Sequence, residues 1–341
     1  MEKQHILLEY DKIYKQYKKK YGDNTIILMQ IGSFYEMCAV IDAICYGEED
    51  IHNICTNILN MAVAEKKYKD GDTYKPYYQG GFPMISQEKY IPMLLDNGYT
   101  IVIVNQITEK PNIERKVTEI ISPGTYLKHK YNTNYLMSIY IEKHKLNNND
   151  NYRVGVAVID LSTGKNYIHD INNNTNNNYW SDEISRLIHF YNPSEIIFHT
   201  DNLLLSNNDI HNKWDIDNIL IRINYFSDSL FKKISYQNDF LQKIFNLKIM
   251  LKPLNYFNLT HKQEVSNAFI YLLLYIKEHK ENILNNIEHP IEYNDQNYLI
   301  LNSNTIRQLN IINNYSYYKG KNESLLEICN KTLTPMGKRL F

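Results

Sequence analysis

The side chains with the clearest capacity for chemistry lie in the segment Gln30–Met37, which reads Gln-Ile-Gly-Ser-Phe-Tyr-Glu-Met and follows an apolar run of strand type. In an extended chain, Phe34 and Glu36 point to one side and Tyr35 to the other. The arrangement places an aromatic ring and an acid together at the end of a rigid strand. The simplest interpretation is that Phe34 belongs to the core and Glu36 to the surface, with Gly32–Ser33 as a bend.

Catalytic motifs are absent from the rest of the sequence. The phosphate-binding pattern G-x-x-x-x-G-K-[ST] is missing, because Met336–Lys338 lacks both the upstream glycine and the hydroxyl. The patterns H-E-x-x-H, paired C-x-x-C and G-x-S-x-G do not occur either. The eleven histidines are scattered, and no acidic metal site is evident. The residues alone therefore predict a binding or structural unit with no catalytic residue, metal ligand or cofactor.

The elements that must position Phe34 and Glu36 form a mixed pattern in the first part of the chain. An amphipathic helix is predicted by apolar residues at helical spacing, and short apolar runs predict strands. The predicted helices are residues 5–21, 48–62 and 86–97, the strands 25–31, 99–106 and 115–121, and a polar Lys/Tyr-rich loop covers 66–78. This alternation predicts a compact α/β or α+β domain.

Two further regions follow, with different patterns. Strands over 135–143, 153–161, 165–170 and 195–199 and a helix over 180–191 predict a second mixed α/β layer. From residue 232 the pattern is mostly helical, with predicted helices over 257–280, 304–313 and from 324 onward, and a strand-like run at 298–301. We therefore expect three domains, residues 1–128, 129–231 and 232–341, the last of them incomplete.

Composition limits the class of partner and the compartment. The 341 residues contain 37 Lys and Arg and 38 Asp and Glu, so the net charge of −1 excludes a uniformly basic nucleic-acid coat but allows a local basic face. Four cysteines without a C-x-x-C pair predict free thiols in a reducing compartment. The longest apolar run, Ala268–Ile276, is about half of the length that a membrane span needs. We expect a soluble intracellular protein.

Several segments, taken in order, resemble the DNA mismatch-recognition MutS family. Gly32–Glu36 matches its Gly-x-Phe-Tyr-Glu signature, although Gly80 stands where the family has alanine, and Met84–Ile85 where it usually has a histidine. The other matching segments are Gly80–Pro83, Tyr90–Gln106, Arg115–Thr118, Ile121–Thr125, Val154–Gly164, Ser324–Leu326 and Thr332–Gly337. The ordered series spans nearly the whole chain and is highly specific.

The resemblance implies a fold for each region. It implies an α/β multidomain protein with a mixed α/β mismatch-binding domain at 1–128, a ribonuclease-H-like connector at 129–231, and the start of an α-helical lever or core domain at 232–341. In this family, the phenylalanine of the signature enters the minor groove and stacks on the mispaired base. The glutamate hydrogen-bonds the same base, and the duplex is kinked.

Motif position assigns these roles to Phe34 and Glu36, with Gly32 and Ser33 beside them. Lys66 and Lys67 are expected to contact phosphates, because they follow a segment that resembles one near the DNA in the family. The lysines of the first helix, Lys12, Lys15 and Lys18–Lys20, are also candidates, but a lysine-rich helix face is more simply explained as solvated.

The resemblance also implies partners. It implies double-stranded DNA with mismatches or small loops, a homodimer in the full-length form, mismatch-repair partner proteins, and no membrane. ATP and Mg²⁺ are expected only for a C-terminal ATPase domain outside these 341 residues. The 341 residues themselves are expected to hold no cofactor and to have no enzyme activity. The divergent loops resemble a branch found in giant DNA viruses and some organelles, so a site of DNA replication is the expected location.

Two alternatives stay open. A ribonuclease-H-like nuclease would need a cluster of three or four carboxylates in the connector, and a protein-docking module would have no DNA binding of its own.

Overall fold

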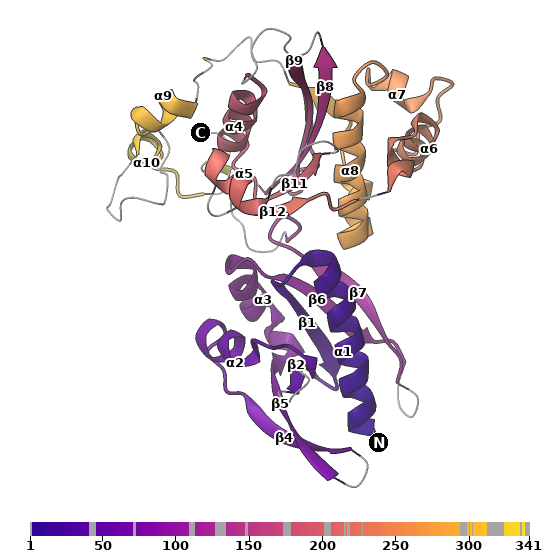
Figure 1. Ribbon diagram of the computed structural model, residues 1–341, viewed down its shortest axis with the longest axis vertical. Helices are drawn as coiled ribbons and strands as arrows, with labels where there is room; N and C mark the ends of the chain where they lie inside the picture. The colour runs from indigo at the N-terminus through magenta and orange to yellow at the C-terminus, as the bar shows by residue number, and fades with distance from the viewer. Residues whose placement is uncertain are drawn as a thin grey trace. The chain divides into compact units, whose positions relative to one another are not determined.

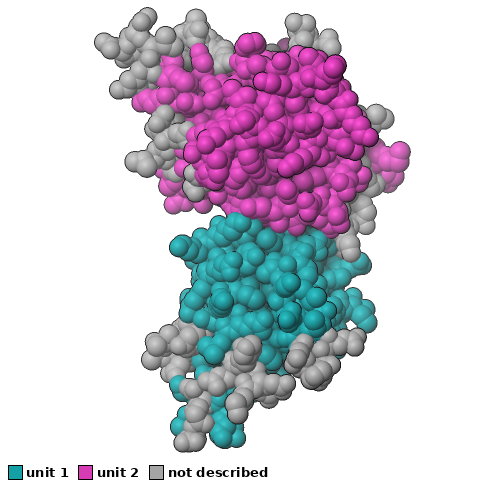
Figure 2. Space-filling view, turned by 90° about the vertical axis from the view of Figure 1, so that its right-hand side faces the viewer, with its two compact units in different colours: residues 1–129 teal, residues 130–341 magenta. Residues whose placement is uncertain are grey.

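The described chain forms two compact units, residues 1–129 and 130–341 (Figure 2). The computed structural model describes residues 2–40, 46–70, 73–108, 113–126, 134–146, 149–172, 179–200, 206–214, 216, 219–226, 228–293, 299, 301, 303–311, 324–334 and 336–337. Within these residues, no helix has the length and apolar character that crossing a membrane requires.

The first unit is built on a mixed sheet whose strand order, in the described chain, is β4-β5-β2-β1-β6-β7, with β3 pairing with β2. Strand β1 pairs in parallel with β6 and antiparallel with β2. The strands are β1 Thr25–Ile31, β2 Phe34–Val40, β3 Tyr46–Gly47, β4 Ala64–Asp70, β5 Thr73–Pro83, β6 Thr100–Gln106 and β7 Arg115–Ile121. The predicted strands at 25–31, 99–106 and 115–121 are thus confirmed.

Helices pack against this sheet on both faces (Figure 1). On one face, the Tyr10 hydroxyl of α1 donates to the Ile27 carbonyl at 3.1 Å. On the other, Ile26 and Leu28 share a core with apolar residues of α2, η1 and α3, because successive strand residues alternate between faces. The helical elements are α1 Glu2–Tyr21, α2 Ile51–Asn53, η1 Ile54–Ile58, η2 Met84–Ser86 and α3 Gln87–Asp96. The helix predicted over 48–62 is therefore shorter than expected.

The segment predicted as a polar loop, residues 66–78, is instead a β-hairpin formed by β4 and β5, so that prediction is wrong. Lys66 pairs with Tyr77 in its register, and the rings of Tyr68 and Tyr77 meet edge to face at 6.1 Å. Tyrosine has a high β-propensity, and cross-strand aromatic contacts stabilise a hairpin. The lysines of this segment suggested a solvated loop, whereas the tyrosines between them favour a strand.

The second unit has a sheet with the order β12-β11-β8-β9-β10-β13 in the described chain. Strands β8, β9 and β10 form an antiparallel meander, and β11 then pairs in parallel with β8 and β12 with β11. The strands are β8 Tyr135–Leu146, β9 Asn149–Asp160, β10 Asn166–Asn172, β11 Glu195–Thr200, β12 Leu220–Ile223 and β13 Pro290–Glu292. This is the ribonuclease-H-like arrangement that was expected of a connector.

Helices also cover both faces of the second sheet (Figure 1). Apolar residues of α4 and α5, among them Ile184 and Trp214, share one core with the sheet, and those of α8, among them Phe269, share the other. The helical elements are α4 Tyr179–Tyr191, α5 Asn207–Trp214, η3 Ser229–Lys232, α6 Ile234–Ile244, α7 Pro253–Tyr256, α8 Gln263–Lys280, η4 Glu281–Asn286, α9 Ser303–Gln308 and α10 Leu325–Cys329.

Helix α8 was expected to belong to a separate helical domain starting at residue 232, and its packing differs from that expectation. Its apolar residues lie in one core with Leu136, Tyr140 and Ala157 of the sheet. The division into three domains stays a prediction. Half of the strand-like run at 298–301 and the last four residues of the chain lie outside the described residues.

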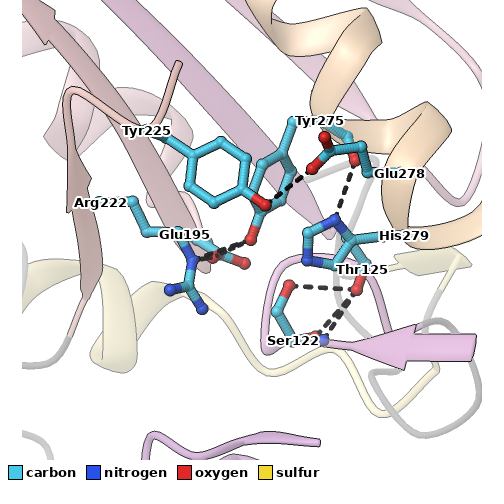
Figure 3. Close-up of polar contacts among 8 residues, drawn as sticks. All are labelled: Ser122, Thr125, Glu195, Arg222, Tyr225, Tyr275, Glu278 and His279. Atoms are coloured by element: carbon cyan, nitrogen blue, oxygen red, sulfur yellow. Dashed lines mark hydrogen bonds and ion pairs between the residues drawn. The ribbon is translucent and has the colours of Figure 1, made fainter. Parts of the chain in front are cut away.

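A buried polar network fastens α8 to the β11–β12 side of the sheet (Figure 3). The Arg222 Nε donates to Glu195 Oε1 at 2.7 Å and to the Tyr275 hydroxyl oxygen at 2.9 Å. The Tyr275 hydroxyl in turn donates to Glu195 Oε1 at 2.6 Å. Glu195 is fully buried and Arg222 nearly so. A buried ion pair of this kind keeps its partners in place because each would be uncompensated alone.

We expect Arg222→Met to lower the free energy of unfolding of the second unit by about 3–5 kcal/mol, because it leaves the Glu195 carboxylate buried without its cation. Urea denaturation measures the change. The control Lys277→Met removes a cation from an exposed pair with Glu281 and should cost less than about 1 kcal/mol. The triple variant Glu195→Leu/Arg222→Met/Tyr275→Phe should unfold at a higher urea concentration than Arg222→Met. A loss in Arg222→Met no larger than in the control would contradict the role given to the network.

Candidate nucleic-acid interface

The Gly-Ser-Phe-Tyr-Glu segment forms the turn and first residues of the β1–β2 hairpin. Ile31 pairs with Phe34, so Gly32 and Ser33 are the two loop residues. Gly32 has a φ of +64°, which is the position where a two-residue hairpin turn places glycine. Phe34 is 42% exposed. The interpretation of Phe34 as a core residue is therefore wrong, and its side chain is partly exposed next to the hairpin turn.

Alternation along β2 gives its first residues different environments. Tyr35 is 3% exposed and packs edge to face against Phe82 at 6.3 Å between ring centroids. Its hydroxyl donates to Asn105 Oδ1 at 2.9 Å. Glu36 is half-buried on the face that carries Phe34. The predicted alternation is confirmed, and the buried Tyr35 anchors the strand that presents the other two side chains.

Hydrogen bonds from neighbouring segments hold the end of β1 in place. The Gln106 backbone N–H donates to Gln30 Oε1 at 2.9 Å, and the Arg115 Nε donates to the Gln30 carbonyl at 3.2 Å. On the other side of the turn, the Met84 N–H donates to the Ser33 carbonyl at 3.0 Å. The side-chain contacts of Gln30 and Arg115 were not predicted, although Arg115 belongs to a segment that carries the family resemblance.

Glu36 has an unusual environment for a carboxylate. Its Oε2 atom is buried and has no hydrogen-bond partner among the described residues. Burial raises the pKa of the Glu36 carboxyl, and the charge of Lys66 partly opposes that rise. A carboxyl group in this state can accept a hydrogen bond from a ligand N–H, or donate one when it is protonated.

Gly81 allows β5 to lie very close to β2 beside Glu36. Gly81 is the register partner of Glu36. A Cβ atom at position 81 would lie 2.2 Å from the Tyr35 carbonyl oxygen and 2.8 Å from the Glu36 Cα. Glycine is therefore required here for the two strands to pair as they do.

The candidate phosphate-binding lysines do not all lie together. Lys66 and Lys67 are both exposed on β4, and the registers of β2, β5 and β4 place Lys66 on the face of Glu36 and Lys67 on the opposite face. Lys18–Lys20 are in the last turn of α1, next to the start of β1, whereas Phe34 follows its end, about 20 Å away along the strand. Lys66 thus shares a strand face with Glu36, and its charge acts on the Glu36 carboxyl.

Three of the segments that carry the family resemblance, Gly32–Glu36, Gly80–Pro83 and Tyr90–Gln106, lie together in the first unit. Phe34 pairs with Pro83 and Tyr35 with Phe82, so the segment Gly80–Pro83 lies beside β2. Tyr90 packs on Phe82 with ring centroids 4.7 Å apart. The fold and this site together define a class of multidomain α/β protein. An aromatic residue stands at the tip of a rigid hairpin in the first unit, and the second unit has a ribonuclease-H-like sheet.

Comparison with known proteins assigns this class to a family. The family models of MutS domain I and MutS domain II match residues 10–130 and 134–288. The chain is 32% identical over 361 residues to a mutS homologue of Acanthamoeba polyphaga mimivirus, covering 96% of this chain and 31% of that protein. It is 30% identical over 338 residues to the DNA mismatch repair protein MutS of Caldanaerobacter subterraneus, covering 96% of this chain and 34% of that protein. The chain belongs to the MutS family.

The match is partial in length. The chain spans about a third of the length of these curated relatives. Among solved structures, a Fowlpox virus resolvase in complex with Holliday junction DNA aligns with 42% of this chain at 18% identity and a TM-score of 0.26, a likeness too low to bear on fold or function.

We expect Gly81→Ala to destabilise the first unit by about 1–3 kcal/mol, because the new methyl group overlaps the Tyr35 carbonyl and β5 must move away from β2. Thermal unfolding followed by circular dichroism measures the loss. Gly98→Ala is the control, since Gly98 has a φ of +77° but no neighbouring atom within 4 Å, and should cost only about 1 kcal/mol. Equal losses in the two variants would show that the close approach is not limiting.

Proposed function

We propose that this chain recognises mismatched DNA, as the DNA-reading part of a longer mismatch repair protein. The observation that supports this most directly is the exposed Phe34 side chain beside the turn of a hydrogen-bonded hairpin. Two residues away, Glu36 Oε2 has no hydrogen-bond partner among the described residues. Its relatives include proteins described as DNA mismatch repair proteins. Phe34 inserts into the minor groove and stacks on the mispaired base, and Glu36 hydrogen-bonds the same base, with Gly32 and Ser33 forming the tip.

The free energies involved explain why such a wedge selects mismatches. Unstacking a base step costs a few kcal/mol, and bending a site costs about 1–6 kcal/mol. Stacking an aromatic side chain on a base returns only about 1–3 kcal/mol. In a matched duplex, the insertion is therefore unfavourable. At a mismatch, part of the pairing is already lost and the duplex bends more easily, so the same insertion becomes favourable. One protein can thus recognise many different lesions.

Affinity must come from contacts with phosphates. The net charge of −1 excludes a uniformly basic surface but allows a local one, and Lys66 is an exposed lysine on the strand face that carries Glu36. Lys66 contacts the phosphate backbone beside the kinked site. Lys67 lies on the other face of β4 and makes a weaker contribution, through long-range attraction.

The remaining activities belong to the full-length protein. We propose that it is a homodimer, that ATP and Mg²⁺ bind a C-terminal ATPase domain, and that repair partner proteins dock on it at sites of DNA replication. The present 341 residues hold no cofactor in this proposal and catalyse no reaction.

The two alternatives have distinct signatures. A nuclease would need three or four clustered carboxylates, whereas the group of potential metal ligands found among the described residues contains two carboxylates and one histidine. A docking module would bind neither matched nor mismatched duplexes. Titration of the full chain against both duplexes at two salt concentrations, with and without a divalent metal, separates the three functions.

Phe34→Ala is expected to abolish the preference for mismatched over matched duplex while weak, salt-sensitive binding persists, because phosphate contacts do not depend on the ring. Fluorescence anisotropy with a labelled duplex pair measures the ratio of dissociation constants. Phe190→Ala removes another exposed aromatic ring, 55% exposed and located in the second unit, and should leave the ratio unchanged. If Phe34→Ala discriminates as well as the wild type, the wedge hypothesis is wrong.

The preference of the wild type for mismatched over matched duplex should fall as pH rises, because Glu36 donates a hydrogen bond to the base only while its carboxyl group is protonated. Burial already raises its pKa above the ordinary value of 4.5 in the free protein, and nearby phosphates should raise it further. The neutral form thus dominates at low pH and is lost as pH passes the raised pKa. Anisotropy titrations across a pH series measure this dependence.

Glu36→Gln is the matched variant for this experiment, because its amide is neutral at every pH. We expect a preference that no longer varies with pH. A Glu36→Gln variant that keeps full affinity and the whole pH dependence would show that another group titrates.

A further inference from the structure

Three potential metal ligands lie together in the second unit, on the face of the sheet that α8 covers. Glu142 and His144 are on β8, and Glu264 is in the first turn of α8. Their ligand atoms all lie within 4.8 Å of one another. The His144 Nε2 is 3.6 Å from Glu264 Oε1 and 4.0 Å from Glu142 Oε1.

The backbone itself fixes this grouping. Glu142 and His144 are two residues apart on one strand, so their side chains point to the same face. Glu264 reaches that face because α8 begins directly against β9 at Gly155. A Cβ atom at position 155 would lie 2.2 Å from the Glu264 carbonyl oxygen. Glycine at this position therefore allows the first turn of α8 to rest on the strand.

In the part of the chain that the structure describes, Glu264 and His144 lack close hydrogen-bond partners, whereas Glu142 Oε2 accepts a hydrogen bond from the Tyr140 hydroxyl at 3.3 Å. The Glu264 side chain is only 7% exposed, yet its nearest charged neighbours, His144 Nε2 and Arg153 Nη1, are 3.6 and 3.8 Å away. Those distances are too long for hydrogen bonds. The His144 Nε2 is buried and has no hydrogen-bond partner among the described residues. Buried charges are normally paired closely or bound to a metal. Within the described chain, the Glu264 carboxylate therefore lacks a close partner of positive charge.

We propose that Glu142, His144 and Glu264 bind a Zn²⁺ ion that joins β8 to α8. Zinc accepts imidazole nitrogen and carboxylate oxygen at about 2.0–2.2 Å, which places the ligand atoms of a tetrahedral site about 3.4 Å apart. The two separations from His144 Nε2, 3.6 and 4.0 Å, and the third separation, which is at most 4.8 Å, contract to this geometry when the ion binds. A water molecule completes the coordination. The imidazole disfavours Mg²⁺, which prefers oxygen ligands.

The charges around the site favour a divalent cation. Two carboxylates face one arginine, Arg153, and a histidine that binds metal in its neutral form. The Arg153 side chain is 52% exposed, so it can turn toward solvent when the ion enters. Lys262 is close to α8 as well, but it pairs with Glu292.

The test is Zn²⁺ binding by the full chain after treatment with a chelator, measured by isothermal titration calorimetry. The chain carries Cys329→Ser throughout, because that exposed cysteine is a competing zinc ligand. We expect one bound Zn²⁺ per chain and a raised unfolding temperature. His144→Gln and Glu264→Gln should each weaken binding by about tenfold or more and remove the thermal shift.

His261→Gln is the matched control, because His261 is exposed and lies three residues before Glu264; its affinity should equal that of the parent. Glu142→Gln, at a half-exposed position, provides a further ligand variant if Glu264→Gln does not fold by circular dichroism. With Co²⁺, a visible spectrum of nitrogen and oxygen ligation without a thiolate charge-transfer band supports the site. The proposal is overturned if the parent takes up no Zn²⁺, or if folded ligand variants bind it as tightly as the control.

Discussion

The close approach of backbone segments at two strand glycines is the constraint on which both units depend. At Gly81, β5 comes so near to β2 that a methyl group would overlap the Tyr35 carbonyl. At Gly155, the first turn of α8 rests on β9 at a similarly short distance. Each glycine therefore fixes where the carboxylate of a proposed site lies, Glu36 in the first unit and Glu264 in the second. Side-chain packing could not set these positions as tightly, because rotamers adjust whereas backbone contacts cannot.

The free-energy cost of exposing the Phe34 ring is offset by the contacts that stabilise the rest of the hairpin. Leaving a phenylalanine in water forgoes about 1.5–3 kcal/mol of burial free energy. The buried Tyr35 ring and the hydrogen bonds to Gln30 and Ser33 offset that loss. They also keep the hairpin in one conformation before any ligand arrives. A pre-ordered tip loses little entropy on binding, so stacking free energy remains for deforming the ligand.

The sequence predicted the elements that carry strong periodicity and missed those that depend on distant contacts. The strands at 25–31, 99–106 and 115–121 and the first helix were predicted because their apolar spacing is unambiguous. The β4–β5 hairpin was missed because its stability comes from cross-strand tyrosine contacts rather than from apolar alternation. The exposure of Phe34 could not be derived from strand pattern, which favoured burial, and only the resemblance to a family indicated it.

The proposed zinc site at Glu142, His144 and Glu264 could not be predicted from the sequence either, because it depends on the position of α8. Its apolar pattern predicted a helix correctly but said nothing about which sheet it would cover. Glu264 lies 120 residues beyond His144, so no local spacing links the two. The only local signals were an acid and a histidine two residues apart on a strand, and a glycine inside the neighbouring strand. Neither is specific until the pairing of β8 with β9 is known.

For a protein that recognises mismatches as proposed, a weakly charged surface is a requirement of the mechanism. Contacts with phosphates stabilise matched and mismatched complexes equally, so adding lysines would raise affinity without improving the choice between them. Selectivity comes from the difference between the free energies of deforming a matched and a mismatched duplex when Phe34 inserts. That difference is only a few kcal/mol. With Lys66 on the face of Glu36 and Lys67 turned away from it, the general attraction stays small. A matched duplex is then released before the wedge can be forced into it.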